Sequence, residues 1–117
     1  MSVISKMTKR KINDPLVNEI VNKLKEEFKL SKLYLFGSRG RGDSNKESDY
    51  DIVAVIPSSR LTREKRDIQA RIALQDIPAA IDIFVFTEKE FAEARKETGS
   101  LAETVTFEGK EIPFANL

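Results

Sequence analysis

Three aspartates lie at the start of two runs of residues that are typical of buried strands. Asp49 and Asp51 flank Tyr50 at the start of the run YDIVAVI, and Asp82 is the second residue of the run IDIFVF. Because side chains alternate between the two faces of a strand, Asp49 and Asp51 are expected on one face, with Cα atoms roughly 6.6 Å apart. Two carboxylates that converge in this way can hold Mg²⁺.

Asp82 lies between two isoleucines, where a charge is unfavourable unless it is paired or bound to a metal. If the two strands are neighbours in a sheet, Asp82 stands beside Asp51, and the acidic cluster repels itself until cations neutralise it. Taken singly, each aspartate could equally cap a loop or begin a solvated strand. The combination favours a metal site.

A glycine and a serine, Gly37 and Ser38, end the apolar run LYLFG and precede the aspartates. Glycine lets backbone amides approach a phosphate, and serine adds a hydroxyl donor. Arg39 and Arg41 follow and can bind phosphate through charge-assisted hydrogen bonds, although solvated loop arginines are nearly as plausible. A Gly-Ser turn alone is a weak signal, but together with the aspartates it indicates a site for a triphosphate.

The composition narrows the chemistry that such a site could perform. The 117 residues include no cysteine and no histidine, which excludes a disulfide framework and a thiolate nucleophile. Any metal must be held by oxygen, which favours Mg²⁺, Ca²⁺ or Mn²⁺. Twenty basic and nineteen acidic residues give a formal charge of +1, so neither direct nucleic-acid binding nor membrane binding is expected.

The start of the sequence bears on the location that we expect for the protein. The first residues, MSVISKMTKRK, are polar and basic without an apolar centre, so a cytoplasmic protein is expected. With 40% hydrophobic and 33% charged residues, the balance is that of a globular domain. We expect a polar basic tail over residues 1–13 and one domain over residues 14–117.

Capping signals predict where two of the helices begin. Asp14 followed by Pro15 is typical of a helix start, and apolar residues at every third or fourth position extend this helix over residues 15–28. Residues 87–96 open on the sequence Thr-x-x-Glu, which is a capping box, and are predicted to form another helix.

A further helix is predicted over about residues 61–75. Leu61, Ile68 and Ile72 supply its apolar period. The charged run TREKRD, residues 62–67, mixes both signs and is therefore expected to form the solvated face of this helix.

Three strands are predicted over residues 33–37, 50–56 and 81–86. After the last predicted long helix we expect a short helix, a turn at Gly109 and an irregular apolar end, with residues 112–117 as a candidate protein contact. The order of elements indicates an α/β (α+β) domain, a small mixed sheet with helices packed on it. The sequence does not determine the strand order.

At these residues the sequence resembles the DNA polymerase β-like nucleotidyltransferase superfamily, and within it the minimal nucleotidyltransferases that are often paired with HEPN proteins. The segment GSRGRGDSNKESDYDIVAV, residues 37–55, is similar to that family's Gly-Ser turn, short helix and Asp-x-Asp strand. The run IDIFVF is similar to the strand that carries the third aspartate. The resemblance implies the polymerase β-like fold. A small departure is Gly40, where family members often have alanine.

The resemblance also implies a role for each candidate residue. Gly37 and Ser38 would bind the triphosphate of ATP or another nucleoside triphosphate. Asp49 and Asp51 would ligate two Mg²⁺ ions, and Asp82 would complete the site and is the favoured proton acceptor. The position of Arg41 is often basic in the family.

For the whole protein the resemblance implies an antitoxin that adds AMP to a hydroxyl of a HEPN-domain toxin. One alternative is a binding module that neutralises its partner by occlusion, without catalysis. Another is a transferase for a small molecule, like the aminoglycoside-modifying relatives, which use a second domain to hold their substrate. A second copy of the chain is a further possible partner.

Overall fold

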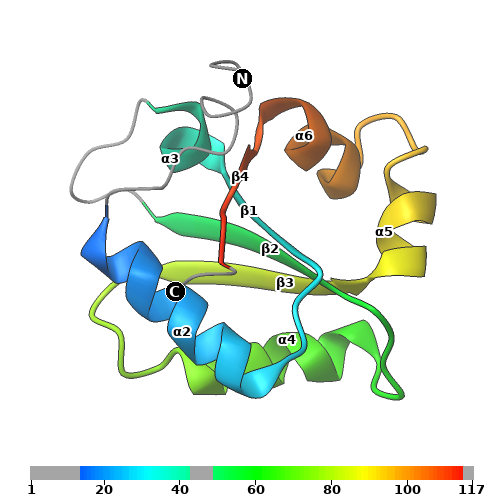
Figure 1. The fold of residues 1–117 in the computed structure, drawn as a ribbon. Coiled ribbons are helices and arrows are strands. Elements are labelled where there is room, and N and C mark those ends of the chain that lie inside the picture. Colours follow the sequence, from blue (N-terminus) through cyan, green and yellow to red (C-terminus); the bar gives the residue numbers. More distant parts are fainter. Residues whose placement is uncertain (1–13, 43–48, 115–117) are drawn as a thin grey trace, which may run out of the picture.

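A four-stranded mixed sheet forms the centre of the computed structural model, which describes residues 14–42 and 49–114 (Figure 1). The strand order is β3-β2-β1-β4, with β2 parallel to β3 and β1 antiparallel to both of its neighbours. The strands are β1 (Lys32–Phe36), β2 (Tyr50–Ile56), β3 (Ile81–Thr87) and β4 (Lys110–Glu111).

The three predicted strands are confirmed to within one residue at their ends, and the structure settles their order. The second and third strands are neighbours, which was the condition for placing Asp82 beside Asp51. The prediction of an irregular end after Gly109 is confirmed for residues 112–114 but missed β4, because Lys110 and Glu111 pair with β1 as a two-residue edge strand. So short a strand has no periodicity that a sequence pattern could reveal.

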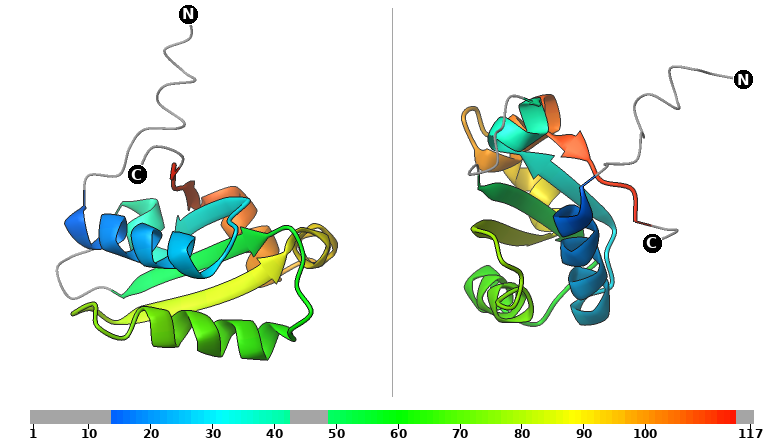
Figure 2. Two further views of the ribbon diagram at one scale, coloured as in Figure 1. Left: turned by 60° about the horizontal axis from the view of Figure 1, so that its bottom comes forward. Right: turned by 90° about the vertical axis from the view of Figure 1, so that its left-hand side faces the viewer.

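Helices cover both faces of the sheet and one of its ends, as Figures 1 and 2 show. On one face, α2 (Pro15–Glu27) and α4 (Arg63–Ala73) enclose a core with residues such as Ile20, Leu24 and Ile52. On the other face, α5 (Glu88–Ala94) and α6 (Leu101–Glu108) enclose a second core. The five-residue helix α3 (Gly37–Arg41) follows β1 directly at the end of the sheet.

The predicted helix caps are confirmed. Asp14 caps α2 by accepting a hydrogen bond of 2.9 Å from the backbone N–H of Leu16, and Pro15 occupies the first turn. Thr87 and Glu90 form the complete capping box of α5. Both signals can be recognised locally, because the first backbone N–H groups of a helix have no acceptor within the helix and a nearby side chain supplies one.

Helix α4 buries the face that was predicted to be exposed to solvent. Arg66 and Asp67, from the charged run expected to face solvent, are 2% and 6% exposed, whereas Ile68 and Ile72 are 46% and 59% exposed. The reason is the backbone of the outer strand β3. The N–H of Val85 donates to Asp67 Oδ1 and its C=O accepts from Arg66 Nη1, both at 2.8 Å. The two charged side chains therefore take the place of a further strand.

Two other expectations concern the chain ends. Ile112, expected to begin an exposed apolar contact, is 2% exposed and packs in the core beside α2. The tail predicted for residues 1–13, and residues 115–117 of the proposed contact, lie outside the described residues. Among the helices that the structure describes, none has the length and apolar character needed to cross a membrane.

Candidate active site

The candidate residues lie at the end of the sheet where β1 ends and β2 and β3 begin; Figure 1 shows α3 at this end of the sheet. β1 ends at Phe36, and β2 and β3 begin at Tyr50 and Ile81. The register pairs Phe36 with Asp51 and Asp51 with Asp82, so these three residues form a row across three strands. Helix α3, which carries the Gly-Ser turn, continues from the same end of β1.

The carboxylates share one face of the sheet, the face that α5 and α6 cover farther along. Val53 and Phe84, two residues beyond Asp51 and Asp82, belong to the core of that face, and alternation places both carboxylates on the same side. Asp49 precedes Asp51 by two residues. Asp51 is half-buried, whereas Asp49 and Asp82 are exposed. The site therefore opens from a half-buried carboxylate to the protein surface.

The electrostatics of Asp51 show that the acidic groups interact. Burial raises the pKa of the Asp51 carboxyl, and the negative charges of Asp82 and Asp49 raise that pKa further. Asp82 also contributes a hydrogen bond to Asp51, which favours the protonated form. Without a cation the cluster is thus self-repelling, which is the property expected of a metal site.

The donor set fits Mg²⁺. In the described part of the chain, no three side chains are already arranged as a complete cage for a metal. Magnesium does not require one, because it is usually held by one or two carboxylates together with substrate phosphates and water. Asp49, Asp51 and Asp82 offer only oxygen atoms, the ligands that this ion prefers.

Gly37 lets the turn approach the carboxylate of Asp51 closely. Its φ of +66° lies in the left-handed region, which favours glycine. A Cβ atom at this position would collide with Asp51 Oδ2 and would lie 3.3 Å from Asp51 Cγ. The backbone at Gly37 and the carboxylate of Asp51 therefore occupy adjoining space that no other residue type leaves open. Ser38 is the next residue, in the first turn of α3.

We expect Gly37→Ala to reduce the activity that the resemblance implies, nucleotidyl transfer, by at least about 100-fold, because the new methyl group displaces the Asp51 carboxylate from its position. Stability should fall by about 1–2 kcal/mol from the left-handed backbone alone. Gly99→Ala is the matched control, since Gly99 also has a positive φ, +82°, but nothing lies within 4 Å of its Cβ position. The control should lose similar stability in urea titrations and keep its kcat. Equal kcat in both variants would show that the close approach is unimportant.

The two arginines lie apart from each other. Arg39 is 13% exposed and stacks on Tyr50, with its guanidinium carbon 3.8 Å from the ring centroid, and it pairs with Asp14 at 3.7 Å. Arg41 is half-exposed and pairs with Glu108 of α6 at 3.8 Å. Arg39 thus reaches the face of β2 opposite the carboxylates.

The link between Asp14, Arg39 and Tyr50 is a feature that the sequence reasoning missed. The Tyr50 hydroxyl donates a 2.8 Å hydrogen bond to Asp14 Oδ2. Burial, and then this hydrogen bond, raise the pKa of the Tyr50 hydroxyl, which keeps it protonated as a donor. Nothing local in the sequence indicated that Tyr50 has a partner 36 residues away.

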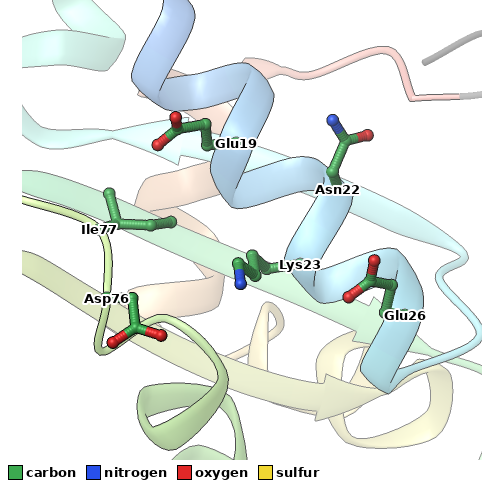
Figure 3. A pocket seen from close by; sticks show the side chains of 6 residues that line it. All are labelled: Glu19, Asn22, Lys23, Glu26, Asp76 and Ile77. Carbon is green, nitrogen blue, oxygen red and sulfur yellow. The ribbon is translucent and has the colours of Figure 1, made fainter.

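A hollow elsewhere on the surface does not involve the candidate site. A pocket of about 290 Å³ lies between α2 and the segment after α4. Figure 3 shows the side chains that line it. Three of its six lining residues are acidic and one is basic; they are Glu19, Asn22, Lys23, Glu26, Asp76 and Ile77. None of the candidate site residues lines it. This pocket is therefore separate from the carboxylate end of the sheet.

Comparison with known proteins identifies the class of the protein. Residues 17–112 match the family model described as a nucleotidyltransferase domain, so the chain belongs to this family and is a nucleotidyltransferase. The mixed sheet and its helices have the polymerase β-like fold that the sequence predicted. The crystal structure of an inferred nucleotidyltransferase from Sulfolobus solfataricus is 31% identical, with a TM-score of 0.54. That match covers 67% of this chain and 69% of the other.

Two solved toxin–antitoxin complexes are more distantly similar. One was crystallised with AMP-PNP and is 21% identical, with a TM-score of 0.48. The other is a mutant MntA–HpeT complex that is 20% identical, with a TM-score of 0.47. Each match covers 80% of this chain and 69% of the other chain. A comparison with curated proteins found no match.

Proposed function

We propose that this nucleotidyltransferase moves AMP from ATP to a hydroxyl group of a partner protein, using two Mg²⁺ ions held by Asp49, Asp51 and Asp82. The observation that carries the proposal is the pairing of Asp51 with Asp82 in register, with Gly37 in contact range of the Asp51 carboxylate. Acidic groups and a phosphate-compatible turn thus meet at one end of the sheet.

Each residue has a role in the transfer. The backbone at Gly37 and the hydroxyl of Ser38 bind phosphate oxygens, and Arg41 adds positive charge beside them. The acceptor oxygen bonds to the α-phosphorus, the bond from that phosphorus to the bridging oxygen breaks, and pyrophosphate leaves. Asp82, exposed at the mouth of the site, takes the proton of the acceptor hydroxyl. Bound Mg²⁺ would neutralise charge on the phosphates and orient the reacting oxygens.

The acceptor that we propose is a hydroxyl on a HEPN-domain toxin, which makes this chain its antitoxin. Two features support a protein acceptor. The exposure of Asp49 and Asp82 leaves the site open to a large molecule. The resemblance of residues 37–55 to the minimal nucleotidyltransferases links the chain to proteins that are paired with HEPN partners.

The test is transfer of label to the protein encoded beside this gene. Purified chain, Mg²⁺ and the partner are incubated with ATP labelled on the α-phosphate or, separately, on the γ-phosphate. We expect label on the partner only from the α-phosphate, and none with Asp49→Asn. Asp76→Asn, the same substitution in the remote pocket, should transfer normally. Full neutralisation of the toxin by Asp49→Asn would instead favour the occlusion mechanism and overturn catalysis as the means of neutralisation.

A further inference from the structure

Asp14, Arg39 and Tyr50 join three separate elements at the back of the candidate site. Asp14 caps the start of α2, Arg39 lies in α3, and Tyr50 begins β2. Asp14 Oδ2 accepts the hydrogen bond of the Tyr50 hydroxyl at 2.8 Å and lies 3.7 Å from Arg39 Nη1. The Arg39 guanidinium carbon lies 3.8 Å from the centroid of the Tyr50 ring. We call these three side chains the clamp.

Two members of the clamp are fixed by other contacts. Tyr50 is 4% exposed, and its backbone N–H donates a 2.9 Å hydrogen bond to the carbonyl oxygen of Ala80, just before β3. Asp14 uses its other oxygen to cap α2 at the N–H of Leu16. Helix α2 in turn buries four apolar residues against the sheet, namely Val17, Ile20, Val21 and Leu24. Arg39 is thus anchored to parts of the fold that do not shift easily.

Helix α3 needs such an anchor. It has five residues, no side-chain cap at its start and no buried residue. A helix this short is not stable by itself, because one or two turns do not compensate the cost of nucleation. Yet Gly37, its first residue, must lie against Asp51 closely enough to exclude a Cβ atom. Small displacements of groups that position a substrate can reduce rates by about 100-fold.

We propose that the clamp is a positioning device, in which Arg39 holds α3 against β2 so that the Gly37–Ser38 turn stays in place beside Asp51. Arg39 acts through the turn and not as a ligand of the nucleotide. This inference rests on the proposed function of the turn and the aspartates. It assigns a role in catalysis to Asp14 and Tyr50, which lie on the face of the sheet away from the carboxylates.

Three substitutions separate the parts of the clamp. Arg39→Met removes the charge and the stacking group but keeps the length of the side chain. Tyr50→Phe removes only the hydrogen bond to Asp14 and leaves the ring under Arg39. Asp14→Asn removes the charge but keeps a residue that caps helices well, so α2 should remain intact.

The expected result is a loss of kcat with little change in KM. We expect Arg39→Met to lower kcat for AMP transfer by about 10- to 100-fold, with the KM for ATP within about threefold of wild type. Tyr50→Phe and Asp14→Asn should lower kcat by about 3- to 10-fold. The double variant Arg39→Met with Tyr50→Phe should resemble Arg39→Met alone, because both changes release the same turn. A KM that rises tenfold or more in Arg39→Met alone would make Arg39 a phosphate ligand and overturn the proposal.

The chain offers matched controls for both residue types. Arg63→Met removes an arginine that also lies over an aromatic ring, 5.0 Å from the Phe86 centroid, but far along the sheet. Tyr34→Phe changes the only other tyrosine, which stacks on Phe91. Both controls should keep wild-type kcat. If they lose as much kcat as the clamp variants do, the effect is one of general stability and the proposal fails.

A second measurement does not depend on transfer. The N–H of Gly42 donates a 3.0 Å hydrogen bond to the carbonyl oxygen of Ser38, which closes α3. We expect hydrogen exchange at this amide to be at least tenfold faster in Arg39→Met than in wild type, with exchange in α4 unchanged. Unchanged exchange at Gly42 would overturn the clamp. Faster exchange in a protein that transfers no AMP would support the clamp and refute the proposed acceptor reaction.

Discussion

Asp51→Asn should abolish AMP transfer and at the same time stabilise the metal-free protein. The loss of transfer should reach about 1,000-fold, since the variant removes a carboxylate from a site whose catalysis is mainly electrostatic. The gain in stability follows because asparagine is nearly isosteric but uncharged, so the burial of charge and the repulsion from Asp82 and Asp49 both disappear. Screening by solvent keeps this gain small, about 0.5 kcal/mol.

Urea titrations with EDTA and with Mg²⁺ check the stability half of this prediction. With EDTA the variant should be slightly more stable than wild type. With Mg²⁺ wild type should gain stability, because an ion that binds only the folded state stabilises it, and the variant should gain little. A variant that is destabilised in EDTA and responds to Mg²⁺ like wild type would make Asp51 a structural residue.

The pH dependence of the metal-free protein has a definite sign. The folded state raises the pKa of Asp51 above its ordinary value of 3.8. At a pH between 3.8 and this raised pKa, the folded protein therefore binds more protons than the unfolded chain. The contribution of Asp51 therefore lowers stability as pH rises through this window. Asp51→Asn should lack that slope.

Among the charged side chains that the sequence predicted to be exposed, Arg66 should contribute most to stability. Arg66→Met should lower the free energy of unfolding by about 2–3 kcal/mol. Arg66 is 2% exposed and donates to the carbonyl oxygens of Leu61 and Val85 and to both carboxylate oxygens of Glu90. Methionine fills much of the space but leaves the Val85 carbonyl without its partner on the outer edge of β3. A domain of this kind has only about 5–15 kcal/mol in total, so the loss is a substantial fraction.

Acid titration gives this prediction a second readout. The Arg66 hydrogen bonds hold the pKa of Glu90 at about 2, below the ordinary 4.5. Glu90 therefore contributes stability that is fully present above 4.5 and is lost as pH falls toward about 2. In Arg66→Met the free energy of unfolding should fall less steeply between pH 4.5 and about 2 than it does in wild type. Arg63→Met is the control, because the Arg63–Asp67 pair is long at 3.9 Å and Arg63 is half-exposed, so the loss should stay below about 1 kcal/mol. Similar losses in the two variants would contradict the role of Arg66.

The elements that could be predicted are those whose signals are local. The strands around Asp51 and Asp82 are apolar runs with clear ends, and the caps at Asp14 and Thr87 satisfy backbone groups within the next few residues. The two-residue period also placed the carboxylates on one face, and only the adjacency of β2 and β3 had to come from the structure.

The features that escaped prediction depend on contacts between distant residues. The orientation of α4 depends on the backbone groups of Val85, which lies 18 residues after Asp67 and bonds to it. The apolar period of the helix alone predicted that the opposite face of α4 would be buried. The partners of Arg39 likewise depend on how α2 and β2 meet at Tyr50. In both cases a polar side chain is buried because it forms hydrogen bonds or an ion pair with a specific partner. The pattern of apolar residues in the sequence does not reveal such partners.

The most direct test of the account is a crystal structure with Mn²⁺, in place of Mg²⁺, and a non-hydrolysable ATP analogue. Anomalous scattering from manganese locates the ions independently of the surrounding density. We predict manganese peaks bound by Asp49 and Asp51, with Asp82 beside them and the triphosphate on Gly37 and Ser38. A nucleotide bound away from the Gly37 turn, or manganese that does not contact these aspartates, would contradict the central claim.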